Sequence, residues 1–85
     1  MTIRFLKPFT KDFKKLPDKQ KKKVNKQIKL LAQDLFHPSL NTRKMTGHPD
    51  VWEARIDYHY RMTFKIDKTV LKLRRVGTHE IYRSP

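Results

Sequence analysis

The sequence predicts an α+β domain in which two N-terminal helices pack on one face of a small antiparallel sheet, in the element order β-α-α-β-β-β. The first observation behind this prediction is the alternation of apolar and polar residues in residues 52–57 and 60–66, which is the period of a half-buried strand. A third run, residues 70–76, begins apolar on both faces, as a central strand does. The second is a set of apolar residues at helical spacing in residues 24–35. The third is the length of 85 residues, which fits a single domain over residues 1–85.

The first elements of the chain are a short strand and a short helix. Residues 3–6 form an apolar run that Pro8 limits, which indicates a strand. Thr10 can cap a helix that begins at Lys11, because a threonine side chain accepts a hydrogen bond from the free N–H groups of the first turn. Pro17 then breaks the helix and can open a second one, since proline is tolerated in a first turn.

The second helix shows the clearest pattern. Its apolar residues are four, three and four positions apart and form one stripe: Val24, Ile28, Leu31 and Leu35. The helix should end near Phe36, because the residue before Pro38 is disfavoured in a helix. Lysines cover much of the remaining surface, and two of them, Lys22 and Lys29, are candidates for contacts with phosphate groups. The stripe is narrow and a sheet follows, so core packing is favoured over lying on a membrane surface.

Three strands follow an irregular segment, residues 37–50, which includes His48 as a loop residue and residues 44–47 as a connector. The expected strands are residues 52–57, 60–66 and 70–76. Tight turns near Asp57 and Lys68 would join them, although neither turn has the Asn-Gly or Asp-Gly signature of a hairpin.

The chain is strongly basic, and so is the expected outer face of its sheet. Lys and Arg total 21 against 8 acidic residues, a formal net charge of +13. So large an imbalance favours a polyanionic partner: nucleic acid, an anionic membrane or an acidic protein. The basic residues expected to share the outer face are Arg55, Arg61, Lys65, Lys72 and Arg74, with Glu53 and Asp57 as the acidic residues among them.

Several other chemistries find no support. The chain has no cysteine, so disulfides and thiolate sites are excluded. Gly47 and Gly77 are the only glycines, too few for a glycine-rich phosphate loop. The four histidines lack paired metal-ligand spacing, and we expect neither a metal nor another cofactor. We see no signal peptide and no apolar run of the ~20 residues that cross a membrane, and therefore expect a cytoplasmic protein without membrane contact.

The remaining class of function is one in which basic side chains bind or cleave a polyanion such as RNA. Cleavage of RNA by its own 2′-hydroxyl needs a base to take the proton of that hydroxyl and an acid to protonate the leaving 5′-oxygen. It also needs cations for the charge that develops on phosphorus, a role that the planar arginine fork suits. The candidates for the base, the acid and the cations are Arg55, Arg61, Arg74, His79 and Tyr82. The competing interpretation is a solvated charged face, with Tyr82 as an edge aromatic.

The chain resembles the RelE/ParE toxin superfamily over essentially its whole length. The markers are the lysine and glycine of KMTG (Lys44 and Gly47), the tract VWEARIDYHYRMTFKI and the ending RVGTHEIYR. The resemblance implies a toxin of a type II toxin–antitoxin module. The ribonuclease members of this superfamily cleave mRNA in the ribosomal A site without a metal, and an antitoxin holds them inactive. The resemblance therefore implies the ribosome with mRNA and an acidic or amphipathic antitoxin as partners.

The resemblance also assigns roles to residues. Arg61 matches the arginine that contacts the scissile phosphate, and Arg55 a basic position that serves as base or phosphate ligand. His79 falls where members place an arginine or a histidine, and Tyr82 matches the late tyrosine that stacks on a base or aids proton transfer. Glu53 replaces a lysine of relatives, which leaves the general base open. Further RNA contacts are expected from Lys44, Lys65, Lys72, Arg74, Lys22 and Lys29.

Two other functions stay open. One is a ParE-like inhibitor of DNA gyrase with the same fold, against which the pair of His79 and Tyr82 argues mildly. The other is a non-catalytic module that binds nucleic acid through its cationic face, with a steep salt dependence and no cleavage.

Overall fold

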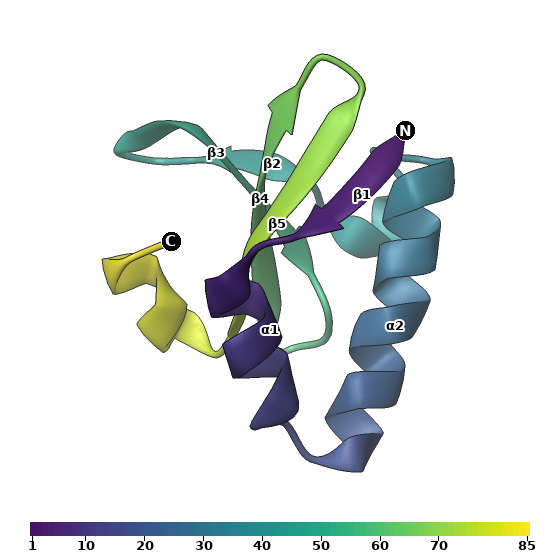
Figure 1. Cartoon of the computed structure of the whole chain (residues 1–85), viewed down its shortest axis with the longest axis vertical. Coiled ribbons are helices and arrows are strands. Elements are labelled where there is room, and N and C mark those ends of the chain that lie inside the picture. The colour runs from purple at the N-terminus through teal and green to yellow at the C-terminus, as the bar shows by residue number, and fades with distance from the viewer.

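A computed structural model describes residues 1–85 as a five-stranded sheet with the strand order β1-β5-β4-β3-β2 (Figure 1). The elements are β1 (Thr2–Phe5), α1 (Lys7–Lys14), α2 (Asp18–Gln33), a 3-10 turn (Pro38–Leu40), β2 (Arg43–Met45), β3 (His48–Arg55), β4 (Arg61–Asp67), β5 (Val70–Gly77) and a C-terminal 3-10 helix, η2 (His79–Arg83). All neighbouring strands are antiparallel except β1, which runs parallel to β5. The predicted α+β class, with two helices packed on a mostly antiparallel sheet, is confirmed. The sheet has one strand, β2, that the predicted element order lacks, and the predicted first strand pairs in parallel with β5.

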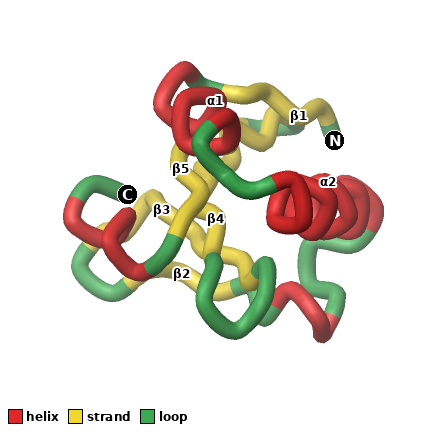
Figure 2. Tube along the Cα trace, turned by 90° about the horizontal axis from the view of Figure 1, so that it is seen from below, coloured by secondary structure: helices red, strands yellow, loops and turns green.

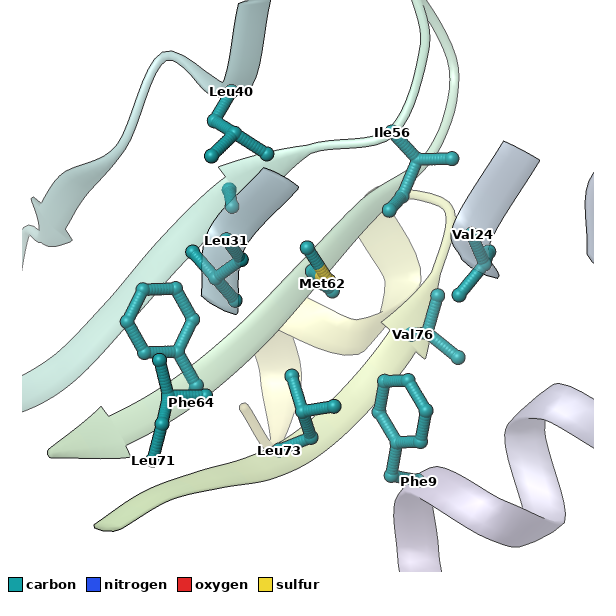
Figure 3. Packing of buried hydrophobic residues seen from close by; sticks show 11 residues of the cluster. Phe9, Val24, Leu31, Leu40, Ile56, Met62, Phe64, Leu71, Leu73 and Val76 are labelled. Carbon is teal, nitrogen blue, oxygen red and sulfur yellow. The ribbon is translucent and has the colours of Figure 1, made fainter. Parts of the chain in front are cut away.

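The two helices lie on one face of the sheet, and η2 lies on the opposite, outer face (Figure 2). One buried cluster joins the helices to the sheet (Figure 3). Its members from the helices are Phe9, Val24 and Leu31, and its members from the strands include Met62, Phe64, Leu71, Leu73 and Val76. The apolar stripe predicted for α2 is therefore core, because Val24 and Leu31 are fully buried and Ile28 and Leu35 pack against the cluster.

The boundaries of both helices differ from those predicted. Helix α1 begins at Lys7, not at Lys11, because Pro8 fits in its first turn and starts the helix instead of preventing it. Thr10 lies inside the helix and is not its cap. Helix α2 ends at Gln33, three residues before the predicted Phe36, since Asp34 takes an extended conformation.

The segment predicted as a connector contains an edge strand. Residues Arg43–Met45 pair with β3 as β2, and Gly47 has a φ of 81°, the left-handed conformation that a glycine adopts freely in a tight turn. As a result β3 begins at His48, so this histidine is a strand residue and not a loop residue. The hairpin of β2 and β3 bends away from the rest of the sheet (Figure 1).

The predicted turns after β3 and β4 are both present. Lys68 takes a φ of 57° in the second turn although it is not a glycine. The first turn is held by the Asp57 carboxylate, which accepts hydrogen bonds from the N–H groups of His59 (2.9 Å) and Tyr60 (3.0 Å). Asp57 also forms an ion pair with Lys23 of α2 at 3.1 Å. It therefore faces the helices, and its predicted place on the outer face is wrong, because the strand ends before it.

The stability of the fold should depend on Asp57 at low pH. Burial alone would raise the pKa of the Asp57 carboxyl group, but hydrogen bonds from Lys23, the turn N–H groups and Gln20 lower it from 3.8 to about 2. Because the pKa of Asp57 is lower in the folded chain than in the unfolded chain, the ionised carboxylate stabilises the fold above pH 3.8. This contribution is lost as the pH falls toward 2. We expect Asp57→Asn to reduce the free energy of unfolding by about 2 kcal/mol at neutral pH.

Urea unfolding measured from pH 7 down to pH 2 tests this expectation. The difference between Asp57→Asn and the parent should shrink to near zero at the acidic end. Asp67→Asn is the matched control, because Asp67 is mostly exposed and its contact with Lys72 is 3.6 Å long. A deficit of Asp57→Asn that stays constant over the whole range would contradict the electrostatic explanation.

Candidate functional site

The outer face of the sheet brings basic side chains of neighbouring strands directly opposite one another. Arg55 of β3 pairs with Arg61 of β4, and Lys65 of β4 pairs with Lys72 of β5. Directly opposed like charges destabilise a sheet unless an anion lies between them. Four of the residues predicted for this face therefore share it, in an arrangement suited to an anionic ligand.

Arg61 is half-buried at the start of β4, where its side chain also braces the turn before it. Its Nη1 donates hydrogen bonds to the carbonyl oxygens of Asp57 and Tyr60, the latter at 3.0 Å. These bonds use one guanidinium nitrogen, Nη1, and no hydrogen bond involves Nε or Nη2. Two nitrogens of the fork remain available to an oxyanion.

The C-terminal segment brings Tyr82 over the same face. Thr63, which alternates with the core residues of β4 and points outward, donates to the Pro85 carbonyl oxygen at 2.9 Å and is fully buried. Gly77 allows this close approach, since a Cβ there would lie 2.9 Å from Cγ2 of Ile81. The tail thus covers the centre of the face that the sequence predicted to be open, and it carries Tyr82 with it.

The hydroxyl group of Tyr82 is hydrogen-bonded to one acidic side chain, and the charges of two basic side chains act on it. It donates to Oε1 of Glu53 at 3.5 Å. Burial raises the pKa of Tyr82, and the negative charge of Glu53 raises it further, while the positive charges of Arg61 and Arg43 oppose the shift. The net direction is upward, so the phenol stays protonated at neutral pH and acts as a hydrogen-bond donor.

Glu53 is buried in the outer face, with only 5% of its surface exposed. Its Oε1 accepts a hydrogen bond from Nε of Arg43 at 3.0 Å, while the Arg43 side chain is itself 66% exposed. Glu53 lines a pocket of about 350 Å³ that we call the Glu53 pocket. Its lining residues are Arg43, Lys44, Met45, Thr46, His48, Glu53 and Tyr82.

Sequence reasoning missed Arg43 and His48 as site residues. Arg43 was overlooked because β2 was expected to be a connector, and His48 because it was placed in a loop. One signal in the sequence could have pointed to this pocket: Glu53 is an acidic residue at an outward position of a strand whose face is otherwise basic.

A second pocket contains three of the predicted RNA-binding lysines. Lys44, Lys65 and Lys72 line a pocket of about 540 Å³ together with Trp52. The ammonium group of Lys44 lies 5.3 Å from the centre of the Trp52 ring, a cation–π distance. Lys44 also lines the Glu53 pocket, so the two pockets are neighbours that share this residue.

The other predicted site residues are placed differently. His79 is exposed at the start of η2, and residues three apart in a 3-10 helix project to the same side, which groups it with Tyr82. Nε of Arg74 donates to the Pro85 carbonyl oxygen at 3.1 Å, so Arg74 helps to anchor the tail. Lys22 and Lys29 are exposed on α2, and α2 and the C-terminal η2, which carries Tyr82, lie on opposite faces of the sheet (Figure 2).

Neither a metal centre nor a membrane span is found among the elements. No three His, Asp or Glu side chains are grouped so that they could hold a metal ion. No helix is long and apolar enough to cross a membrane.

Comparison with solved structures places this fold among bacterial and archaeal toxins. YafQ of E. coli BL21(DE3) superposes with a TM-score of 0.78 at 18% identity, covering 94% of each chain. A YoeB/ParE toxin of Agrobacterium tumefaciens superposes with a TM-score of 0.79 at 15% identity, covering 93% of this chain and 99% of the other. RelE in the RelB–RelE antitoxin–toxin complex of Methanococcus jannaschii gives a TM-score of 0.76 at 24% identity, with coverage of 96% and 99%.

At these identities the similarity concerns the fold alone. No curated protein sequence matches the chain significantly. The family model described as the ParE toxin of the type II toxin–antitoxin system parDE, however, matches residues 3–81, nearly the whole chain. The chain therefore belongs to the ParE toxin family of type II toxin–antitoxin systems, within the RelE/ParE superfamily.

Proposed function

We propose that this toxin is a ribosome-dependent mRNA endoribonuclease. The observation that carries the proposal is the environment of Tyr82, a protonated hydroxyl group held by Glu53 and acted on by the charges of Arg61 and Arg43. A proton donor beside fixed cations is what cleavage of a phosphodiester requires. The opposed Arg55 and Arg61 add a place for the phosphate itself.

The proposed reaction uses the substrate's own 2′-hydroxyl group. His79, a side chain type that titrates near neutral pH, takes the proton of the 2′-hydroxyl as the oxygen attacks phosphorus. The bond between phosphorus and the 5′-oxygen breaks, and Tyr82 gives its proton to that oxygen. Arg61 and Arg55 stabilise the charge on the phosphoryl oxygens, and the products are a 2′,3′-cyclic phosphate and a free 5′-hydroxyl.

The toxin's partners follow from its charge and its family. RelE of M. jannaschii is in complex with RelB, and YafQ of E. coli is in complex with DinJ. For this chain we propose an antitoxin with an acidic or amphipathic segment that orders on binding and neutralises part of the +13 charge. Ribosomes carrying mRNA are the second proposed partner.

Primer extension on mRNA from purified ribosomes programmed with a short message tests the proposal. We expect cuts within the message that depend on both the toxin and the ribosome. A ParE-like gyrase inhibitor is the alternative that the family description favours. It predicts intact messages and loss of DNA supercoiling by gyrase in the same preparation, and that result would overturn the ribonuclease.

Tyr82→Phe should separate proton donation from stacking. The substitution removes the hydroxyl group and keeps the ring, so we expect a loss of about a hundredfold in single-turnover cleavage with nearly unchanged ribosome affinity. Tyr58→Phe is the matched control, because Tyr58 is 76% exposed at the turn after β3 and should tolerate the loss of its hydroxyl group. If Tyr82→Phe cleaves as fast as Tyr58→Phe, Tyr82 is not the acid.

A further inference from the structure

The Glu53 carboxylate has one oxygen in use and one that is open. Both of its hydrogen bonds, from Arg43 and from Tyr82, go to Oε1, and Oε2 has no hydrogen-bond partner. Oε2 is also not sealed from solvent, since the buried polar atoms without a partner do not include it. Glu53 lines a pocket, and an ionised carboxylate oxygen without a protein partner can accept hydrogen bonds, so this oxygen suits a ligand that donates them.

The surroundings of this acceptor suit a nucleotide better than a bare phosphate. The Glu53 pocket holds about 350 Å³, enough for a base. Tyr82 supplies an aromatic wall and Met45 an apolar one, while Arg43 and Lys44 are exposed cations at the same pocket. An aromatic platform with a hydrogen-bonding group for the base edge and cations for the backbone is how proteins take up unpaired RNA bases. A phosphate alone would be repelled by Glu53.

Guanine is the base whose edge matches an open carboxylate. It presents two adjacent donors, N1–H and the 2-amino group, whereas the Watson–Crick edges of adenine and cytosine place a ring acceptor beside their one amino donor. Uracil offers a single N–H group between two carbonyl oxygens. A carboxylate accepts and does not donate when ionised, so the guanine edge gains two charge-assisted hydrogen bonds.

We propose that the Glu53 pocket binds a guanine base of the RNA substrate, with the open oxygen Oε2 of Glu53 as the shared acceptor for N1–H and the 2-amino group. The inference rests on the proposed function in that it takes RNA as the substrate. Tyr82 lines this pocket and is also the proposed acid, so the recognised nucleotide would lie next to the cleaved phosphate. Glu53 is then the residue that decides which nucleotide flanks the cut.

Mononucleotide binding to the full chain tests the pocket without any cleavage. Titration of GMP, AMP, CMP and UMP, followed by NMR, should show GMP binding about tenfold more tightly than the others, with the largest shifts at Tyr82, His48 and Lys44. Inosine monophosphate, which lacks the 2-amino group, should bind several-fold more weakly than GMP. This comparison uses the unmodified protein and does not depend on a variant that folds.

Glu53→Gln should abolish the preference for GMP, because an amide donates as well as accepts and matches adenine better. Glu80→Gln is the matched control, since Glu80 is exposed on η2 and does not line this pocket. Equal binding of all four nucleotides, equal binding of GMP and inosine monophosphate, or a uniform loss in Glu53→Gln would each overturn the proposal. A preference for GMP without ribosome-dependent cleavage would support the guanine pocket and overturn the proposed ribonuclease activity. Cleavage without a preference for GMP would support the ribonuclease activity and overturn the guanine pocket.

Discussion

Arg61→Ala should reduce ribosome-dependent cleavage by about a hundredfold to a thousandfold. Loss of one donor aimed at charge that develops in the transition state typically costs this much in rate. Arg61→Lys should recover little of it, because an ammonium group cannot offer two nitrogens of a planar fork to one phosphate. Single-turnover cleavage of a programmed ribosome at saturating toxin measures the effect on the chemical step.

The same arginine braces the turn after β3, so a structural loss must be separated from a chemical one. Arg61 donates to the carbonyl oxygens of Asp57 and Tyr60, and both variants lose part of this bracing. We expect a change in unfolding free energy of about 1 kcal/mol, too small to unfold the domain. Arg4→Ala, on the exposed edge strand β1, is the control for loss of one positive charge. Cleavage by Arg61→Ala within a few-fold of the Arg4→Ala rate would show that Arg61 is not catalytic.

Asp12→Asn should destabilise the domain by about 2–3 kcal/mol. The Asp12 carboxylate accepts from Nε (2.6 Å) and Nη2 (3.2 Å) of Arg75 and from the N–H group of Val76 (3.2 Å), which ties α1 to β5. The hydrogen bond and charge of Asp12 raise the pKa of Arg75 despite partial burial of the guanidinium group. Removing the Asp12 carboxylate leaves the positive charge of Arg75 uncompensated. The expected loss of stability is smaller than for a fully buried ion pair, because the Arg75 side chain is 28% exposed.

The destabilisation by Asp12→Asn should also extend through the C-terminal tail to the outer face of the sheet. Arg75 donates to the Ser84 carbonyl oxygen at 3.1 Å, next to the Pro85 anchor, so the same guanidinium group holds α1 and the segment that carries Tyr82. We therefore expect hydrogen exchange in Asp12→Asn to rise at residues 79–85 as well as at α1. Asp18→Asn, at the exposed start of α2, is the matched control. Unchanged protection of residues 79–85 in Asp12→Asn would show that Arg75 does not couple the two regions.

The sequence predicted the elements whose pattern is local and missed those that depend on partners. The stripe of Val24 and Leu31 and the alternation around Met62 identified the core correctly, because a period of 3.6 or 2 reports directly which side of an element is buried. β2 was missed because a three-residue edge strand has too few residues to show a period and exists only through its pairing with β3. The start of α1 was misplaced because Pro8 can either end a strand or open a helix.

The chemistry of the site divides in the same way. The sequence alone determined that the chain is a small, strongly basic α+β domain whose strands carry arginine and lysine on one face, since charge and side-chain alternation are fixed by residue order. Only the tertiary structure decided what those residues do. In the folded chain Asp57 pairs with Lys23, and Arg74 is hydrogen-bonded to the tail. Tyr82 lies against Glu53, although the two residues are 29 positions apart in the chain. Contacts between distant segments depend on how strands pair and where a tail docks, and no local period in the sequence encodes them.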